Sequence, residues 1–299
     1  MIRILGTIFV ALTGLAFGSF LNVCLSRWPE GESVVKPRSH CRNCGRTLAW
    51  WENLPLASWL ALRGRCRTCH APIGWRYPLV ELAVGGLWGW QAWQFLSAAF
   101  DPGLPGILVY QSVLAAIGRL IFYWILVALA VLDAENFWLP NWITIPGIAL
   151  GFAATLLRAA LDSLSPVNQS MEPMRYVVGR EAIRALIAIL IAAGILLLVR
   201  WAYWLVRRQE GIGLGDVKLM ALLAAWLGLP GALLSLSVGV VLGAVAALAL
   251  LAVPAARRRS SSWATAKLPL GTFLCVGGVI SALWGERIIA AYLRWAGFY

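Results

Sequence analysis

Charged residues are scarce in this chain. They make up 13% of its 299 residues, whereas 61% of the residues are hydrophobic. Soluble globular domains have about 25% charged residues, so a water-soluble fold of this composition would expose large apolar patches. The shortage of charge excludes an ordinary soluble domain and favours a chain that crosses a membrane several times.

Negatively charged residues are scarcer than positively charged ones, with 13 Asp and Glu against 25 Lys and Arg. In a soluble protein this excess would suggest a nucleic-acid partner, but in a membrane protein Lys and Arg collect in short cytoplasmic loops. If the N-terminus faces outward, 16 Lys and Arg fall in the loops on the cytoplasmic side and five on the opposite side. The loops so placed in the cytoplasm are 27–78, 133–141, 207–218 and 254–267. We therefore expect membrane lipids and no nucleic acid as partners; Arg200, near the end of an apolar segment, is expected to reach toward the headgroups.

The apolar segments predict an all-α polytopic membrane protein with about eight transmembrane helices. They cover roughly 4–26, 79–99, 111–132, 142–161, 182–206, 219–230, 231–253 and 268–293. The sixth is short, and Pro230–Gly231 predicts a turn after it, so six or seven crossings stay open if this pair forms a re-entrant hairpin. We expect three parts: a first transmembrane helix (1–26), a small cytoplasmic zinc-knuckle loop domain (27–78) and a larger transmembrane domain (79–299).

Two short cysteine motifs stand in the polar loop 27–78. Cys41-Arg-Asn-Cys44 and Cys66-Arg-Thr-Cys69 are separated by 21 residues. Each motif brings two thiolates within reach of one ion, which is typical of a structural Zn²⁺ site. A loop of this size has little core, so metal binding would contribute to its folding. Four reduced thiols without a metal are the simpler alternative.

The sequence Cys66-Arg-Thr-Cys69-His70 also matches the motif for covalent haem attachment. Haem would leave the first cysteine pair unexplained, and a cytoplasmic loop is the wrong place for that chemistry and for disulfides. We interpret His40 and His70 as bystanders or as residues that support the metal ligands.

Two aspartates are predicted to lie at the same membrane face. Asp133 ends the third apolar segment, and Asp216 follows Gly213 and Gly215 just before the sixth. Acidic residues near membrane spans are costly and are often functional. Paired carboxylates suit aspartyl proteolysis, in which one takes a proton from water and the other donates one to the peptide carbonyl. Lys218 is read first as a cytoplasmic anchor and second as part of the active-site loop.

These residues also have alternative explanations. Asp133 alone could simply end a helix at the interface. The glycines resemble a nucleotide-binding loop, but the strand that such a loop requires is missing. A transporter using both aspartates as ion sites, a protease that cuts within a helix, and a non-catalytic zinc scaffold stay open.

The chain also resembles the bacterial type IV prepilin peptidases, a family of GxGD membrane aspartyl proteases. The similarity covers nearly the whole chain. It is carried by Gly18-Ser-Phe-Leu-Asn22, the cysteine loop from Pro37 to Glu81, Asp133 with Pro140-Asn141, Gly213-Leu-Gly215-Asp216, and Lys267-Leu-Pro-Leu-Gly271, which has Leu270 where Phe is more usual.

This resemblance implies a bifunctional enzyme of the bacterial cytoplasmic (inner) membrane, with its active site facing the cytoplasm. It implies removal of the short basic leader of type IV pilin-like precursors, in support of pilus biogenesis or type II secretion. It also implies S-adenosylmethionine-dependent N-methylation of the new N-terminus, for which no residues are assigned. Asp133 and Asp216 would be the catalytic residues, and the oligomeric state stays open.

Overall fold

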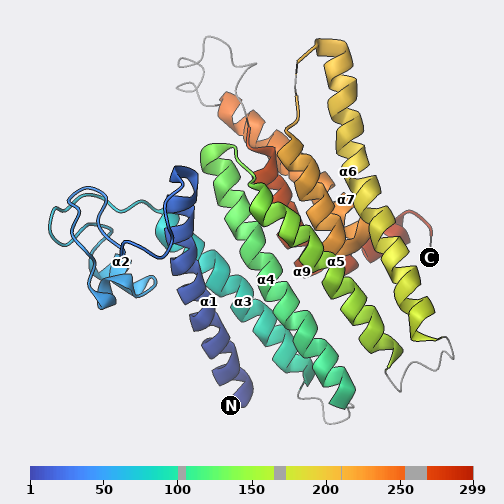
Figure 1. Ribbon diagram of the computed structural model, residues 1–299, viewed down its shortest axis with the longest axis horizontal. Helices are drawn as coiled ribbons and strands as arrows, with labels where there is room; N and C mark the ends of the chain where they lie inside the picture. Colours follow the sequence, from blue (N-terminus) through green and yellow to red (C-terminus); the bar gives the residue numbers. More distant parts are fainter. Residues whose placement is uncertain (100–105, 165–172, 210, 253–267, 299) are drawn as a thin grey trace. The chain divides into compact units, whose positions relative to one another are not determined.

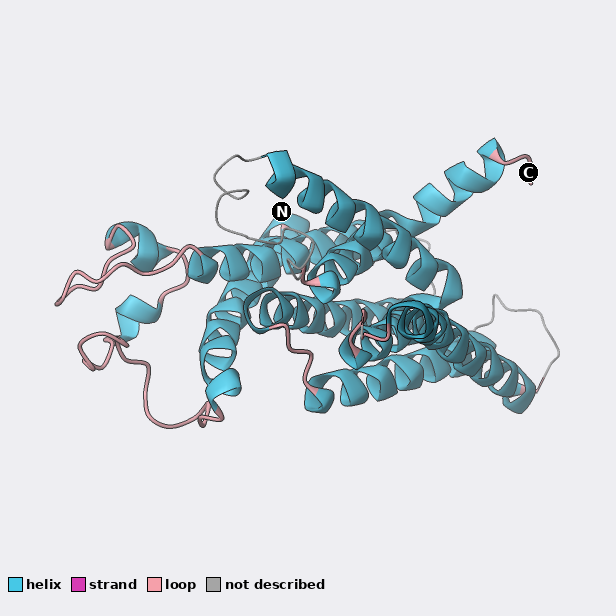
Figure 2. Ribbon diagram, turned by 90° about the horizontal axis from the view of Figure 1, so that it is seen from above, coloured by secondary structure: helices cyan, strands magenta, loops and turns pink. Residues whose placement is uncertain are grey.

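The structure is a computed structural model that describes residues 1–99, 106–164, 173–209, 211–252 and 268–298. Helices and loops make up this described part, in which no strand is present (Figure 2). The predicted all-α membrane architecture is confirmed. The charged loop 254–267, including Lys267, lies outside the described residues.

The helices are α1 (Ile2–Arg27), α2 (Ala57–Ala61), α3 (Arg76–Ala99), α4 (Gly106–Asn136), α5 (Asn141–Ser163), α6 (Met174–Arg207), α7 (Leu214–Ala252) and α9 (Leu270–Trp295), with short 3₁₀ turns η1 (Trp28–Glu30) and η2 (Trp50–Asn53) (Figure 1).

Within the described residues, each of the eight predicted apolar segments coincides with a helix, and the sixth and seventh together form α7. In the described part, six helices are long and apolar enough to cross a membrane. These are Ile2–Glu30, Tyr110–Asn136, Asn141–Ser163, Met174–Arg207, Leu214–Ala249 and Leu270–Trp295. By its contacts the chain divides into two compact units, Met1–Ala128 and Leu129–Tyr299.

In the first unit, α1 and α3 pack antiparallel through small residues. Near one end, a Cβ added to Gly18 would lie 2.8 Å from the Glu81 Cα, so the two backbones are in direct contact. One turn further along α1, the Asn22 amide donates to the Tyr77 carbonyl at 2.9 Å. Small residues give membrane helices this close approach, because lipid supplies no hydrophobic force between them. The Trp88 indole then donates to the Leu120 carbonyl and ties α3 to α4.

In the second unit, α7 is a helical hairpin. Its backbone leaves the helical region at Gly228, where φ is 69° and ψ is 178°. A left-handed φ favours glycine, and Pro230 then falls in the first turn of the second arm, where its missing N–H costs little. The break therefore lies at Gly228, two residues before the predicted Pro230–Gly231 turn.

Contacts with α5 and α9 fix the direction of each arm of α7. The first arm runs parallel to α5, because the Trp226 indole donates to the Gly147 carbonyl and Lys218 bonds to Asn141 at the start of α5. The second arm runs antiparallel to α9, because Ser281 donates to the Gly231 carbonyl while Gly239 packs on Leu274. The hairpin thus returns to the end of the unit from which it started.

Candidate active site and metal centre

The carboxyl group of Asp133 is held at the junction of α4 and α9. Asp133 lies in the last turn of α4 and is 5% exposed. Its Oδ2 accepts hydrogen bonds from the Thr272 backbone N–H at 2.7 Å and from the Thr272 hydroxyl at 3.2 Å. The single proton of this hydroxyl is shared with the Ala130 carbonyl, which lies 2.9 Å from the Thr272 Oγ1. Thr272 stands in the first turn of α9, whose N–H groups have no partner within their own helix.

Asp216 lies in the first turn of α7, directly after the glycine-rich loop in the sequence. Its Oδ2 accepts a longer hydrogen bond, at 3.3 Å, from the Gly213 N–H. The Asp216 and Asp133 carboxylates are close enough to interact electrostatically. The structure therefore brings together two carboxyl groups that are 83 residues apart in sequence, and both lie in the second unit.

Leu139 fills the space between the two aspartate-bearing segments. A Cβ added to Gly215 would lie 3.0 Å from the Leu139 Cβ. A Cβ added to Gly271 would lie 3.0 Å from the Leu139 Cδ1 and 2.9 Å from the Asp133 carboxyl carbon. Gly215 and Gly271 are therefore required for close packing around the carboxyl pair.

Lys218 and the glycine loop are held by neighbouring helices. The Lys218 ammonium donates to the Asn141 side chain at 2.6 Å, which links α7 to the start of α5. The Arg200 guanidinium of α6 donates to the Ile212 carbonyl at 2.5 Å, and the Tyr203 ring packs over Gly211. Arg200 thus supports the loop before Asp216, where the sequence suggested only a headgroup contact.

The sequence did not single out Thr272, Leu139 or Tyr203, and it assigned Arg200 no role in the site. Thr272 directly follows the Lys267–Gly271 motif, and that position was the one available signal. Threonine and leucine are common in apolar helices, so the roles of these residues become visible only through contacts between distant segments.

The four cysteine sulfurs of the first unit form one cluster. The Sγ atoms of Cys41, Cys44, Cys66 and Cys69 all lie within 4.8 Å of one another. The Cys41 and Cys69 sulfurs are 3.8 Å apart, and four thiolates at about 2.3 Å from a tetrahedral Zn²⁺ would have the same spacing. The donor set and the spacing fit a metal ion, and the predicted ligand group is assembled as expected.

The two knuckles have the same backbone design. In each, the first cysteine donates its N–H across a small hairpin, Cys41 to the Arg46 carbonyl and Cys66 to the Ala71 carbonyl, both at 2.9 Å. Backbone N–H groups of Cys69 and Thr68 lower the pKa of the Cys66 thiol to about 6, which favours the thiolate that binds metals. His70 takes a left-handed turn position, with φ of 57°, and is not in the sulfur cluster.

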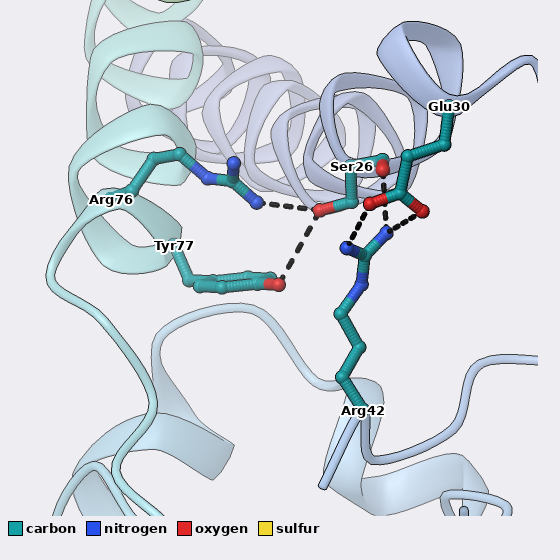
Figure 3. A network of polar contacts seen from close by, with 5 residues as sticks. All are labelled: Ser26, Glu30, Arg42, Arg76 and Tyr77. Atoms are coloured by element: carbon teal, nitrogen blue, oxygen red, sulfur yellow. Dashed lines mark hydrogen bonds and ion pairs between the residues drawn. The ribbon is translucent and has the colours of Figure 1, made fainter. Parts of the chain in front are cut away.

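Polar contacts join the first knuckle to the end of α1 and to η1, and join this end of α1 to α3 (Figure 3). Arg42 lies between the two cysteines of its knuckle and donates to the Glu30 carboxylate at 2.8 Å and to the Ser26 carbonyl at 2.5 Å. The Ser26 hydroxyl also accepts from Arg76 at 2.5 Å and lies 3.4 Å from the Tyr77 hydroxyl. The cysteine loop is thus fixed to the ends of two helices within the first unit.

A partly buried ion pair stabilises the loop. The Glu52 side chain is 1% exposed, accepts from Arg46 at 2.6 Å and from the Ala49 N–H at 2.7 Å, and so closes the η2 turn. The Arg46 guanidinium lowers the pKa of Glu52 below its ordinary value. Because Arg46 also ends the first knuckle hairpin, the metal cluster and the η2 turn are mechanically linked.

Comparisons with known proteins agree with this arrangement. Residues 12–95 match the bacterial peptidase A24 N-terminal domain, and residues 120–248 match the type IV leader peptidase family. A protein of Pseudomonas aeruginosa named prepilin leader peptidase/N-methyltransferase is 34% identical over 96% of this chain and 93% of its own length. Proteins of the same name from Aeromonas hydrophila (34% identical; 95% of this chain, 92% of the relative) and Myxococcus xanthus (37%; 81% and 63%) are also similar.

No solved structure matches the chain. The family models cover both the cysteine loop and the two aspartate-bearing segments, and the relatives from Pseudomonas aeruginosa and Aeromonas hydrophila match nearly end to end. This chain belongs to the type IV leader peptidase family.

Proposed function

We propose that this chain is a membrane aspartyl endopeptidase that removes the leader of type IV pilin-like precursors. The single observation that carries the proposal is the pairing of Asp133 and Asp216 at helix ends, with backbone N–H groups fixing each carboxyl. A water molecule between the carboxyls would lose a proton to the ionised one as it attacks the peptide carbonyl. The protonated carboxyl would donate its proton to the carbonyl oxygen.

The surroundings of the pair support peptide binding. Gly213 is exposed and lies beside the Asp216 carboxyl, so the backbone at this position is accessible to an extended substrate segment. Lys218 is proposed to brace this loop through Asn141 and to take no part in proton transfer.

The remaining assignments extend the proposal to the whole chain. Residues 1–26 would form the first transmembrane helix, 27–78 a cytoplasmic domain in which Cys41, Cys44, Cys66 and Cys69 hold a structural Zn²⁺, and 79–299 the peptidase domain. The basic loops favour an active site that faces the cytoplasm from the inner membrane, next to anionic lipids. The names of the relatives support N-methylation of the product, with S-adenosylmethionine as methyl donor.

The test is cleavage of a pilin-like precursor by purified protein. Asp133→Asn and Asp216→Asn each remove one proton-transfer partner at nearly constant size, so each variant should lose at least roughly 10²- to 10⁴-fold in rate. Equal amounts of folded protein should be compared, and the N-terminus of the product sequenced.

A matched control is Asp162→Asn, which neutralises an acid near the other end of α5. This variant should cut at the wild-type rate. If both Asp133→Asn and Asp216→Asn retain near wild-type turnover, the aspartyl mechanism is wrong and an ion-transport role of the pair becomes the better account.

A further inference from the structure

The two aspartates receive different numbers of hydrogen bonds. This difference bears on which of them acts as the general base and which as the general acid. The Oδ2 of Asp133 accepts from the Thr272 N–H at 2.7 Å and, at 3.2 Å, from the Thr272 hydroxyl, whose single proton is shared with the Ala130 carbonyl at 2.9 Å. Within the described part of the chain, the Oδ2 of Asp216 accepts one hydrogen bond, from the Gly213 N–H at 3.3 Å. Donors that point at a carboxylate stabilise its ionised form.

The donors on Asp133 also come from the start of a long helix. Gly271 and Thr272 lie in the first turn of α9, a helix of 26 residues. The N-terminal end of a helix carries a partial positive charge that favours a nearby anion. No side chain at position 271 separates the carboxyl from this helix end, because a Cβ there would lie 2.9 Å from the Asp133 Oδ2. Asp216, in the first turn of α7, also lies at such a helix end, so the difference between the two carboxyls rests on their hydrogen bonds.

We infer that Asp133 is the ionised general base of the pair, that Asp216 is the protonated general acid, and that Thr272 is the positioning residue that sets this order. The inference rests on the proposed peptidase function. The attacking water gives its proton to Asp133 while its oxygen bonds to the peptide carbon. The proton of Asp216 moves to the carbonyl oxygen, which leaves a neutral gem-diol.

In the second half of the reaction, Asp133 loses the proton that it gained and Asp216 regains the proton that it lost. Asp133 returns its proton to the leaving amide nitrogen as the C–N bond breaks. Asp216 takes a proton from one gem-diol hydroxyl, which becomes the new carboxyl carbonyl. The two residues therefore end the cycle in the protonation states in which they started.

Other ionisable groups around the pair do not provide the same asymmetry. Cys275 of α9 is buried and lies close enough to interact with both aspartates. Lys218 of α7 is bonded to Asn141 at the start of α5. Glu135 follows Asp133 on α4 and is exposed. Among the described residues, Thr272 is thus the neighbour whose side chain bonds to the Asp133 carboxyl and not to the Asp216 carboxyl.

The test is the pH dependence of kcat/KM for precursor cleavage by the full-length protein, with Thr272→Val as the main variant. Valine keeps the shape of threonine but removes the hydroxyl donor. We expect the acid-side limb, which reports loss of the base, to move upward by about half a pH unit to one unit. The alkaline limb, which reports loss of the acid's proton, should stay in place.

Two control variants separate this effect from a general loss of packing. Thr272→Ser keeps a hydroxyl and should restore the wild-type acid limb. Ser281→Ala removes another hydroxyl bond of α9, the one to the Gly231 carbonyl, far along the helix from the aspartates, and should leave both limbs unchanged. Thr272→Ala gives the same expected shift and replaces Thr272→Val if the valine variant does not fold.

A shift of the alkaline limb alone would reverse the assignment of base and acid. An equal fall of kcat/KM at every pH, with both limbs in place, would reduce Thr272 to a packing residue and overturn the inference. Either result would leave the peptidase function intact, because that function fails only if Asp133→Asn and Asp216→Asn still cut.

Discussion

At the scale of single residues, the aspartates and cysteines could be predicted because their chemistry is rare in apolar surroundings. A carboxyl at a span end and a thiol in a repeated short motif are visible without any knowledge of contacts. Thr272 is different, since its hydroxyl meets Asp133 across 139 positions of sequence. Only the tertiary fold shows that this ordinary threonine belongs to the site.

Gly271 is expected to be essential because of the space that it leaves. In Gly271→Ala the new methyl group would lie 2.9 Å from the Asp133 carboxyl, so the carboxyl or the start of α9 must shift. We expect cleavage to fall by about 10²-fold, the size of effect that a misplacement of about 1 Å produces. The measurement is the single-turnover rate on a precursor.

The control for this prediction is Gly194→Ala in the interior of α6. A Cβ at Gly194 meets no atom within 4 Å. This variant should cut normally and should be slightly more stable, since alanine is the better helix former. Wild-type activity in Gly271→Ala would mean that the carboxyl does not need its present contact with α9.

Glu52 is expected to hold the metal loop through a pH-dependent contact. Because Arg46 lowers the pKa of Glu52 in the folded loop, the ion pair stabilises the loop above the ordinary pKa of about 4.5. The stabilisation is lost as the pH falls through the lowered, folded-state value. At pH 7, Glu52→Gln should therefore release zinc to a chelator faster than wild type, by roughly ten-fold.

The difference between wild type and Glu52→Gln should shrink as the pH is lowered below about 4.5. Comparing the two proteins at each pH cancels the effect of cysteine protonation, which both share. Glu30→Gln is the control, because its ion pair with Arg42 is half exposed and contributes little. A difference that stays constant down to pH 3 would contradict the role assigned to the ion pair.

At the scale of helices, length and hydropathy were sufficient to predict each apolar segment, and the hairpin in α7 was predictable to within two residues. The chain breaks at Gly228 and not at Pro230–Gly231, because proline is tolerated in the first turn of a helix whereas a left-handed φ favours glycine. Direction and pairing of the arms could not be predicted, since they depend on which small residues meet which helix.

The last turns of α6 are expected to hold the loop that precedes Asp216. Arg200→Gln removes the guanidinium that binds the Ile212 carbonyl, and the loop should become looser. We expect kcat to fall by about ten-fold, the effect of losing one hydrogen bond to a charged group. Steady-state cleavage at saturating precursor is the measurement.

A matched substitution at the other end of α6 separates this effect from a change in helix charge. Arg184→Gln removes an exposed ion pair with Glu181 and should leave kcat unchanged. If Arg200→Gln and Arg184→Gln behave alike, Arg200 does not position the loop and its side chain has the headgroup role suggested by the sequence.

At the scale of the whole molecule, composition alone gave the membrane class and the separation of a polar loop from apolar helices. The spacing of charges gave an orientation. The meeting of the carboxyl groups followed from topology, because both aspartates end or begin helices at one end of the second unit. The sequence could not provide the distances, since they arise from backbone packing at Gly215 and Gly271.

The shortness of the first arm of α7 has a consequence for the surrounding lipid. From Leu214 to Leu227 the arm is about 20 Å long, whereas the hydrocarbon core of a bilayer is about 30 Å thick. This is a hydrophobic mismatch, which the membrane relieves by thinning around the protein at a small cost per ångström. In a thicker bilayer the carboxyl pair would sink further from the water that it must activate. We expect cleavage in vesicles of phosphatidylcholines with acyl chains of increasing length to fall several-fold from the thinnest to the thickest bilayer. A rate independent of chain length would mean that the carboxyls reach water at any thickness; a falling rate would make acyl-chain length a regulator of precursor processing.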